Sequence, residues 1–370
     1  MKFLLISPKN RTVYNFRGEL IKRLQRNGYE VIVTGPDRDN IEAVEELGVR
    51  FVEIPMNKNG TSIAGDLKYC RSLKKLMKAE KPDVLLGYTI KPVVYGTIAG
   101  WLAKVPNKNC LITGGGYTFT STSFKAKVLG KIVRTLYKFA FKKADNVIFQ
   151  NADDKNEFIE RKLVKEEKCH VVNGSGVDLE RFGKAEFPQK VSFFMLSRIL
   201  KSKGVREYLK AAEIVKEKYP ETEFSLLGKY EYEMQDAVPK EDVETLIEKG
   251  VIKRYDETKD VRPYYEKASV YVLPSYREGT PRTVLEAMAT GRPVITTDAN
   301  GCRQTVKDGV TGFIVPVKDE KTLAERMIYF IENPEEIKKM GDLSYEYCKE
   351  NFEVHKVNKD MLEFMGIEEK

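Results

Sequence analysis

Short apolar runs alternate with longer amphipathic stretches along nearly the whole sequence. Seven runs in the first half have the composition of strands, and several have the almost continuous apolar character of parallel strands covered on both faces. They are Lys2–Ser7, Glu30–Gly35, Arg50–Pro55, Asp83–Tyr88, Asn109–Gly114, Asn146–Asn151 and Cys169–Gly174. Helical patterns lie between them, for example at Arg17–Asn27, Leu67–Ala79, Val93–Ala103, Lys125–Lys143 and Asp153–Leu163. This βαβ repetition predicts a doubly wound α/β domain.

The pattern lapses near Asp178–Gln189 and then restarts. Six more strands are predicted, at Val191–Arg198, Glu223–Gly228, Val251–Asp256, Val270–Ser275, Pro293–Asp298 and Gly312–Pro316. Helices fit Gly204–Tyr219, Val261–Lys267, Pro281–Thr290 and Asp319–Glu332, and only helical patterns follow Pro334. The predicted fold class is therefore α/β, with two Rossmann-like domains facing each other across a cleft. We predict domains over residues 1–183 and 184–345, with a C-terminal helix in 346–370 that packs back toward the first domain.

Length and composition agree with a two-domain soluble protein. The chain has 370 residues, 42% hydrophobic and 32% charged, and a domain takes roughly 100–200 residues. No apolar run reaches the roughly 18 residues of a membrane span, and the apolar start is too short for a signal peptide. Five scattered cysteines without a Cys-x-x-Cys motif indicate reduced thiols in the cytoplasm. With only His170 and His355, a histidine-based triad or a multi-histidine metal site is not expected.

The positive charge is confined to the first half. Residues 1–185 carry 33 Lys and Arg against 20 Asp and Glu, whereas the remainder carries 30 against 35. The basic excess suits an anionic partner: phosphate, nucleic acid or an acidic membrane surface. No nucleic-acid-binding module is recognisable, so a nucleic-acid partner is not predicted.

The densest cluster of chemically informative residues is Leu273–Ile295. A buried strand ends at Ser275, a turn with Gly279 follows, and Pro281 suits the first turn of a helix that runs to Thr290. Free N–H groups and a positive helix end then lie at the carboxyl edge of a parallel sheet, which is a ready anion site. Glu278 precedes this helix and Glu286 lies inside it, although two glutamates eight residues apart can also be solvated surface.

A second cluster, Ser197–Gly204, follows the first strand of the second domain. Arg198 and Lys203 would point into the cleft beside the Glu278 turn, where an Arg fork and a Lys point charge suit a diphosphate. The alternative is a solvated basic loop. A triplet in the first half, Asp37-Arg38-Asp39, has the D-x-D form that metal-dependent glycosyltransferases of another fold use. It follows the second strand in a loop with a proline, so we predict a helix cap there and no metal site.

These segments together resemble the retaining GT-B glycosyltransferases of family 4. Glu278 and Glu286 match the E-x7-E signature of that family, and Leu273-Pro-Ser, Glu-Ala-Met-Ala-x-Gly-Arg-Pro-Val-Ile and Asp308-Gly-x-Thr-Gly-Phe match its flanks. The resemblance implies that Arg198 and Lys203 hold the diphosphate of a UDP-sugar donor. It implies that Glu278 holds hydroxyls of the sugar and Glu286 those of the ribose. The remaining donor-binding residues that it implies are Gly279, Thr280, Pro281, Thr283, Val284 and Tyr255, the last beside the base.

The implied chemistry needs no metal or cofactor. Negative charge grows on the departing diphosphate, where Arg198, Lys203 and the amides near Thr283 can stabilise it. The expected catalytic residues are Glu278, Arg198 and Lys203. No covalent nucleophile is assigned, because attack on the same face, with the departing diphosphate taking the proton of the acceptor, is the more plausible route.

The first domain is expected to bind the acceptor. Its first loop, Ser7–Gly18, lacks a G-x-G-x-x-G fingerprint, which argues against a dinucleotide dehydrogenase. Tyr14-Asn-Phe-Arg resembles a subgroup that adds N-acetylgalactosamine to an undecaprenyl-diphosphate-linked amino sugar. Ile112–Tyr117 resembles a glycine segment of that subgroup and can otherwise be a flexible loop. The predicted acceptor-binding residues are Asn15, Arg17, Gly115, Gly116 and Tyr117.

The stretch Lys125–Lys143 contains seven cations, no acid and many interleaved apolar residues. A basic amphipathic helix is typical of a membrane-surface element, for which Lys127, Lys131, Arg134 and Lys138 are the candidates. The alternative is a core helix with a solvated basic rim.

The first hypothesis is thus a cytoplasmic glycosyltransferase, peripheral on the inner face of the plasma membrane. Its partners would be a UDP-sugar donor, a polyprenyl-diphosphate-linked saccharide acceptor and an anionic membrane surface. The sugar would be a hexose such as N-acetylgalactosamine, in bacterial glycan assembly. A UDP-hexose or UDP-galacturonate transferase is an alternative, and a sugar-nucleotide epimerase or a phosphorylase on the same fold is a more distant one.

Overall fold

The computed structural model describes residues 1–369 except 58–59, 61, 115–123 and 233, and for residues 124–129 it describes the backbone alone. The described chain forms two compact units. Unit 1 combines Met1–Ser175 with His355–Lys370, and unit 2 is Gly176–Val354. We predicted divisions after residues 183 and 345, whereas the units divide after residues 175 and 354.

Unit 1 is built on a parallel sheet of seven strands in the order β3-β2-β1-β4-β5-β6-β7. The strands are β1 (Lys2–Ile6), β2 (Glu30–Gly35), β3 (Arg50–Glu53), β4 (Val84–Tyr88), β5 (Asn107–Ile112), β6 (Asn146–Phe149) and β7 (Cys169–Val171). The α-helices are α1 (Asn10–Arg26), α2 (Ile41–Glu45), α3 (Ile63–Glu80), α4 (Ile90–Ala103), α5 (Phe124–Lys143), α6 (Ala152–Glu160) and α13 (Val354–Phe364). The order places β1 beside β4, so the direction of winding reverses there, as in a doubly wound sheet.

Both faces of the unit 1 sheet are covered, which explains why its strands are apolar at nearly every position. Along β1, Phe3 and Leu5 belong to one buried cluster, and Leu4 and Ile6 belong to the cluster on the other face. The C-terminal helix α13 supplies three buried side chains to the first cluster, Val357, Met361 and Leu362. The last helix of the chain is therefore part of the unit 1 core, although it follows unit 2 in the sequence.

Unit 2 is built on a parallel sheet of six strands in the order β10-β9-β8-β11-β12-β13. The strands are β8 (Ser192–Leu196), β9 (Glu223–Leu227), β10 (Lys253–Tyr255), β11 (Val270–Leu273), β12 (Val294–Thr297) and β13 (Gly312–Val315). The α-helices are α7 (Val205–Lys218), α8 (Lys240–Glu248), α9 (Arg262–Glu266), α10 (Arg282–Ala289), α11 (Glu320–Glu332) and α12 (Pro334–Asn351). Every strand that the sequence predicts is present, whereas helices α2 and α8 were not predicted.

The order of the unit 2 strands determines which loops meet. β8 pairs with β11, and Phe193 lies opposite Val270, which follows it by 77 residues in the sequence. The loops that follow these two strands therefore leave the same edge of the sheet. Ligands of open α/β sheets bind at such a reversal point, outside the carboxyl ends of the strands. The two motifs that the sequence singled out in this half, Ser197–Gly204 and the Glu278 turn, are those two loops.

Candidate functional site

Two loops make close backbone contact at the carboxyl edge of the unit 2 sheet. One follows β8 and contains Lys203, and the other follows β11 and contains Glu278. They meet at Gly204, whose φ is 74°, and a Cβ there would lie 2.0 Å from the carbonyl oxygen of Pro274. Only glycine combines this backbone conformation with so close an approach. The glycine therefore allows the lysine loop to lie directly against the glutamate loop.

Glu278 and Lys203 form an ion pair within this edge. The Nζ atom of Lys203 donates to Oε1 of Glu278 at 2.5 Å, and the hydroxyl of Ser275 donates to the same oxygen at 2.8 Å. The two charged side chains are only 21% and 15% exposed. The structure thus brings together two of the three predicted catalytic residues, and it adds Ser275, to which the sequence analysis gave no role.

Side chains from neighbouring elements fix both loops. The hydroxyl of Tyr276 donates to Oε1 of Glu207 on α7 at 2.6 Å. Asp236 accepts hydrogen bonds from the backbone N–H and the hydroxyl of Ser202. Because these partners lie far along the chain, the sequence offered no signal for them. They hold Lys203 and Glu278 on a rigid base, as a preorganised charged site requires.

A third loop supports the glutamate turn from the β12 side. The backbone N–H of Glu278 donates to the carbonyl oxygen of Asn300 at 2.9 Å. The next residue, Gly301, has a φ of 77°, and a Cβ there would lie 2.3 Å from the carbonyl oxygens of both Glu278 and Gly279. Gly301 is a supporting residue that the sequence analysis missed; its only signal is the Asn-Gly pair that follows a strand.

Helix α10 begins directly after the glutamate turn. Its N-cap is Pro281, whose ring carries no hydrogen-bond acceptor for the first amides of the helix. Thr280 and Thr283 are partly exposed there, whereas Gly279 and Pro281 are buried. Val284 is fully buried, and its N–H donates to the carbonyl oxygen of Pro281 at 3.0 Å. Both the side chain and the amide of Val284 are thus engaged inside the unit, and its role in donor binding stays a prediction.

Glu286 has partners different from those of Glu278. Its Oε2 atom accepts from the hydroxyl of Tyr265 at 3.1 Å, and its Oε1 atom accepts from Nε of Arg282 at 3.3 Å. Burial raises the pKa of Glu286, and Arg282 opposes that rise. The two glutamates of the pair are thus held by separate networks, one on the turn and one inside α10.

The other two predicted donor-side residues are more exposed. Arg198 is 51% exposed, and its Nη1 atom lies 3.9 Å from Oε1 of Glu231 and 3.5 Å from Sδ of Met234. Tyr255 ends β10 and is 38% exposed, with its ring 5.0 Å from that of Tyr264 in an edge contact. Arg198 follows β8 and Tyr255 ends β10, both at the carboxyl edge of the sheet. The contacts described for these two residues do not include Lys203 or Glu278.

The first loop of unit 1 is shorter than predicted. Helix α1 begins at Asn10, so Asn15 and Arg17 lie on a helix, and the prediction of a loop over Ser7–Gly18 was wrong. Arg17 is 3% exposed and lies over the ring of Tyr88, 5.3 Å from its centre. Asn15 is half-buried. An acceptor could contact Asn15 directly, whereas Arg17 can act only through the residues that cover it.

Several predicted residues cannot be placed. Gly115, Gly116 and Tyr117 lie outside the described residues, as does the side chain of Lys127. Of the other predicted membrane residues on α5, Lys131 and Lys138 are exposed and Arg134 is half-buried. None of the described helices is both long enough and apolar enough to cross a bilayer.

The Asp37–Asp39 triplet forms a turn and not a helix cap. Helix α2 has Asn40 as its N-cap, with no side-chain cap bond. The carboxylate of Asp37 accepts from the N–H of Asp39 at 3.0 Å, and the side-chain amide of Asn10 donates to the carbonyl oxygens of both aspartates at 2.9 Å. The cap prediction was therefore wrong, and the triplet instead connects this turn to the start of α1.

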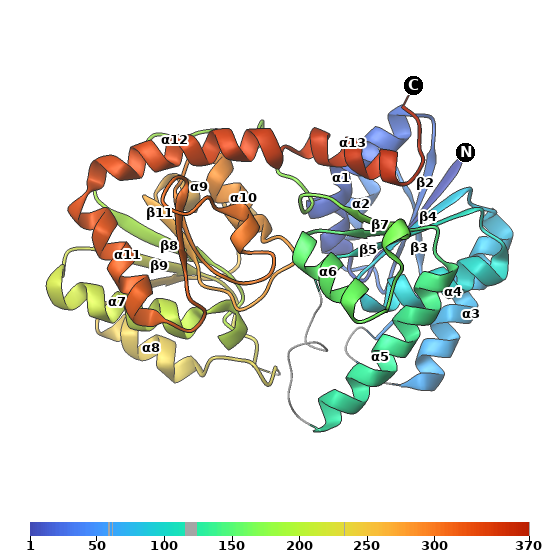
Figure 1. The fold of residues 1–370 in the computed structure, drawn as a ribbon, viewed down its shortest axis with the longest axis horizontal. Helices are drawn as coiled ribbons and strands as arrows, with labels where there is room; N and C mark the ends of the chain where they lie inside the picture. The colour runs from blue at the N-terminus through green and yellow to red at the C-terminus, as the bar shows by residue number, and fades with distance from the viewer. Residues whose placement is uncertain (58–59, 61, 115–123, 233, 370) are drawn as a thin grey trace. The chain divides into compact units, whose positions relative to one another are not determined.

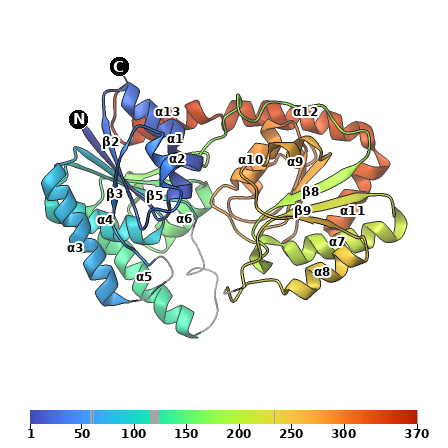
Figure 2. The ribbon, with the colours of Figure 1, turned by 180° about the vertical axis from the view of Figure 1, so that it is seen from behind.

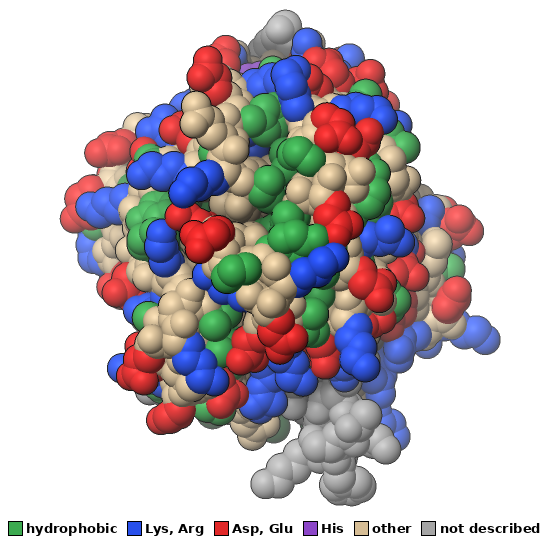
Figure 3. All heavy atoms as spheres, turned by 90° about the vertical axis from the view of Figure 1, so that its left-hand side faces the viewer, with side chains coloured by type: hydrophobic (Ala, Val, Ile, Leu, Met, Phe, Trp, Pro, Cys, Tyr) green, Lys and Arg blue, Asp and Glu red, His purple; other side chains and the backbone are tan. Residues whose placement is uncertain are grey.

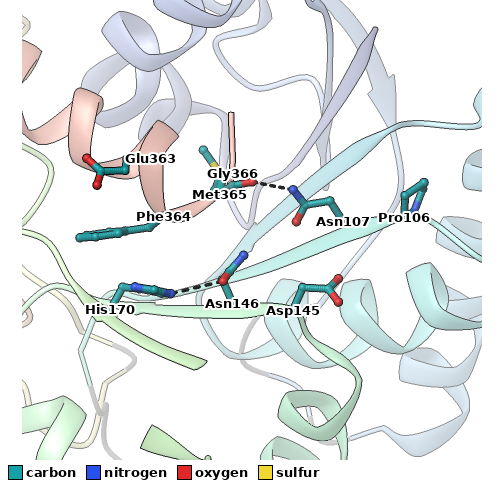
Figure 4. Close-up of a pocket in the computed structure, with 9 residues that line it drawn as sticks. All are labelled: Pro106, Asn107, Asp145, Asn146, His170, Glu363, Phe364, Met365 and Gly366. Carbon is teal, nitrogen blue, oxygen red and sulfur yellow. Dashed lines mark hydrogen bonds between the residues drawn. The ribbon is translucent and has the colours of Figure 1, made fainter. Parts of the chain in front are cut away.

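Unit 1 also has an open pocket, which lies near the amino ends of β5, β6 and β7, away from the carboxyl edge (Figure 4). His170 stacks on Phe364 at 4.6 Å and lies 3.3 Å from Oδ1 of Asn146. The side-chain amide of Asn107 donates to the carbonyl oxygen of Met365 at 2.6 Å. These contacts fasten the end of α13 to the sheet. No predicted site residue lines the pocket, and we interpret it as a structural junction.

Two glycosyltransferase family models match the chain. The model described as "Glycosyl transferases group 1" matches residues 177–347, and the model described as "Glycosyl transferase 4-like" matches residues 2–151. The first match contains the whole Lys203–Glu278 cluster and helix α10. The second contains β1 to β6.

Curated relatives match most of the chain. It is 26% identical to the "N,N'-diacetylbacillosaminyl-diphospho-undecaprenol alpha-1,3-N-acetylgalactosaminyltransferase" of Campylobacter jejuni, over 90% of each chain. It is 30% identical to the "UDP-Gal:alpha-D-GlcNAc-diphosphoundecaprenol alpha-1,3-galactosyltransferase" of Escherichia coli, over 73% of this chain and 72% of the relative. Both of these relatives are glycosyltransferases named for a saccharide on undecaprenyl diphosphate.

Solved structures share the fold. A glycosyltransferase from Rickettsia africae superposes with a TM-score of 0.79 at 18% identity, over 98% of this chain and 97% of the other. Anabaena HepE, solved in complex with UDP and glucose, superposes with a TM-score of 0.79 at 18% identity, over 99% of each chain. These likenesses confirm the predicted GT-B fold.

Proposed function

The chain belongs to the group 1 glycosyltransferases, and on that premise we propose that it transfers a sugar from UDP to a saccharide carried on a polyprenyl diphosphate, with retention of configuration. The sugar is a hexose, with N-acetylgalactosamine the first candidate. Support for the acceptor class comes from the two relatives named for undecaprenyl-diphosphate-linked saccharides. Galactose is the alternative sugar that the second relative suggests.

The observation that carries the proposal is the partly buried Lys203–Glu278–Ser275 cluster at the carboxyl edge of the unit 2 sheet. A carboxylate only 15% exposed is suited to accept hydrogen bonds from sugar hydroxyls, because the partly buried site strengthens them. The ammonium of Lys203, 2.5 Å from that carboxylate, can stabilise charge on a diphosphate bound next to the sugar. The cluster can thus contact both the sugar and the diphosphate, the two groups joined by the bond that breaks.

In the proposed reaction, an acceptor hydroxyl oxygen forms a bond to the anomeric carbon while the bond from that carbon to the diphosphate oxygen breaks. The electron pair of the broken bond stays on the diphosphate, which takes the proton of the acceptor hydroxyl on the same face. Lys203, Arg198 and the amides at the start of α10 near Thr283 stabilise the departing charge. We propose that this set replaces a divalent cation and that no cofactor takes part.

The remaining roles follow from position. Glu286 accepts from the ribose hydroxyls and Tyr255 borders the base, while Gly279, Thr280 and Pro281 shape the sugar pocket. On the acceptor side, Asn15, Gly115, Gly116 and Tyr117 are the proposed contacts, with Arg17 as a positioning residue. Because the acceptor is anchored in lipid, the enzyme acts at the inner face of the plasma membrane as a peripheral protein.

The first experiment measures binding and slow hydrolysis of UDP-N-acetylgalactosamine, UDP-N-acetylglucosamine, UDP-galactose, UDP-galacturonate and GDP-sugars, with and without EDTA. One UDP-sugar should bind best and should be hydrolysed at a rate that EDTA leaves unchanged. Affinity for none of these compounds would overturn the donor assignment. Activity that is lost in EDTA and restored by Mg²⁺ would overturn the metal-independent step, and interconversion of UDP-sugars without an acceptor would indicate an epimerase.

Two variants test the donor residues. Glu278→Ala should abolish transfer while UDP binding is largely retained, and Arg198→Ala should weaken the binding of UDP and the UDP-sugar alike. Arg206→Ala is a matched control, because Arg206 also forms a surface ion pair, with Asp242 at 3.2 Å. Full turnover by Glu278→Ala, or an unchanged UDP affinity in Arg198→Ala, would refute the corresponding role.

A further inference from the structure

Large apolar side chains are exposed together on one face of unit 1. Trp101 on α4 is 41% exposed, and Ile132 and Phe139 on α5 are 52% and 43% exposed. The rings of Trp101 and Phe139 meet edge to face at 6.0 Å, so the patch spans both helices. Figures 1 and 2 show α4 and α5 side by side. Contiguous exposed apolar surface of this kind marks an interaction site.

A row of cations runs directly beside the apolar residues. Successive helix residues are about 100° apart, so Lys131, Lys138 and Lys142 form one exposed row of α5. Ile132 and Phe139 form the next row, and Lys143 places its Nζ atom 4.0 Å from the centre of the Trp101 ring. The sequences of α4 and α5 contain no acidic residue. The patch is therefore apolar and positively charged at once.

The core of unit 1 does not account for this pattern. The side of α5 that faces the core already buries Val133, Tyr137, Ala140 and Phe141. A core helix with a solvated basic rim would need no second apolar row on its exposed side. By contrast, the face of the molecule in Figure 3 mixes acidic and basic side chains. The α4–α5 face, defined here as Trp101, Ile132, Phe139, Lys131, Lys138, Lys142 and Lys143, is thus a specialised surface.

We propose that the α4–α5 face docks on an anionic lipid bilayer, with the Trp101 ring at the level of the lipid headgroups. The proposal rests on the proposed function, because a polyprenyl-linked acceptor lies in a membrane. Charge complementarity favours a bilayer: the lysine row meets anionic headgroups, while the adjacent apolar row enters the acyl boundary. Tryptophan is enriched at that boundary because its ring is apolar and its N–H is polar.

The test uses Trp101 itself, since it is the only tryptophan in the chain. Wild-type protein is mixed with vesicles of phosphatidylglycerol and phosphatidylcholine, and with vesicles of phosphatidylcholine alone. We expect a blue shift of Trp101 fluorescence and quenching by brominated lipid with the anionic vesicles, and at least tenfold weaker binding to the neutral ones. No fluorescence change and no co-sedimentation with anionic vesicles would overturn the proposal. Binding to a DNA duplex without vesicle binding would also overturn it.

Variants separate the two components of the face. Replacing Lys131, Lys138 and Lys142 by Gln should weaken vesicle binding about a hundredfold, at roughly fivefold per lysine. Its matched control replaces Lys338, Lys339 and Lys349 of α12 by Gln, which changes the net charge equally and should leave binding near the wild-type value. Ile132→Ser with Phe139→Ser should also lose binding, whereas Leu343→Ser, at a site 42% exposed on α12, should not.

The failure of this proposal differs from failure of the proposed function. UDP-sugar binding and hydrolysis in solution, together with Tm, are measured for every variant. The variants of the α4–α5 face should keep all three, so a loss of vesicle binding cannot be ascribed to unfolding. Wild-type protein that hydrolyses its UDP-sugar and ignores anionic vesicles refutes the docking surface alone. Protein that binds vesicles and no UDP-sugar refutes the proposed function alone.

Discussion

Gly301→Ala tests whether the position of the Glu278 turn sets the rate of the reaction. Gly301 is not a predicted donor-binding residue, and it has no side chain that could bind a substrate. Its backbone lies against the turn, where a Cβ would come within 2.3 Å of the carbonyl oxygens of Glu278 and Gly279. The substitution therefore moves the turn without removing any functional group from it.

The required movement can be worked out from these contacts. Real Cβ atoms essentially never approach a heavy atom more closely than 3.0 Å, so the carbonyl groups must retreat from 2.3 Å to at least that distance. A misplacement of about 1 Å costs on the order of a hundredfold in rate. We therefore expect Gly301→Ala to lower kcat/KM for UDP-sugar hydrolysis by tens-fold or more. It should also lower stability, because a φ of 77° costs alanine about 1–2 kcal/mol.

Gly250→Ala is the matched control. Gly250 has a φ of 69° and nothing within 4 Å of its Cβ position. An alanine there therefore introduces the same kind of backbone strain but no steric clash. Its Tm should fall by about 2–4 °C per kcal/mol of strain, with kcat/KM unchanged. Both variants are assayed for UDP release and for Tm. A Gly301→Ala rate within twofold of the Gly250→Ala rate would refute the reasoning.

Three further predictions concern the charged groups of unit 2. Lys203→Met should lower the free energy of unfolding by about 2–4 kcal/mol, because it leaves the largely buried Glu278 carboxylate without its cation. In urea titrations, the double variant Lys203→Met with Glu278→Gln should regain most of that stability. Equal losses of stability in the single and the double variant would contradict this prediction. Burial raises the pKa of Glu286, so its ionisation opposes folding: wild-type stability should fall as pH rises from the unfolded value of about 4.3 through the folded pKa, and Glu286→Gln should flatten that part of the profile. Arg292 is fully buried and donates to three carbonyl oxygens, and burial lowers its pKa to about 10. Arg292→Lys should therefore lower the free energy of unfolding by about 2–4 kcal/mol. A decrease of less than about 0.5 kcal/mol in thermal unfolding would contradict this prediction.

The strand–turn–helix unit that contains Glu278 was predictable because its parts are local in the sequence. The apolar run to Leu273, the glycine of the turn and Pro281 each indicate one step of a strand–turn–helix unit. The sequence placed Lys203 beside the Glu278 turn, and the pairing of β8 with β11 explains their contact across 75 residues, because adjacent parallel strands end at one edge. Gly301 could not be predicted in the same way, because its role depends on a backbone contact that no pattern in the sequence records.

Unit 1 was less predictable for the same physical reason. The start of α1 has Lys9 as an N-cap without a side-chain cap bond, so the usual signal for a helix start is missing. The burial of Arg17 depends on Tyr88, which arrives on β4 at the centre of the sheet. Similarly, the hydropathy of Trp101 and Phe139 suits a core, and only the packed structure reveals that both are exposed.

Net charge predicts surfaces better than it predicts sites. The proposed site for an anionic donor lies in the half of the chain where acids outnumber bases, 35 to 30. This is physically consistent, because exposed charges more than about 10 Å away are screened at ordinary ionic strength, so a bound diphosphate responds to nearby groups. Lys203 and the first turn of α10 supply those groups, whatever the total charge of unit 2. A bilayer is different, because its surface contacts a whole face of the protein at once. The attractions of the individual lysines of α5 to anionic headgroups then add together. The basic excess of the first half is therefore an argument for a docking surface and carries no information about the donor pocket.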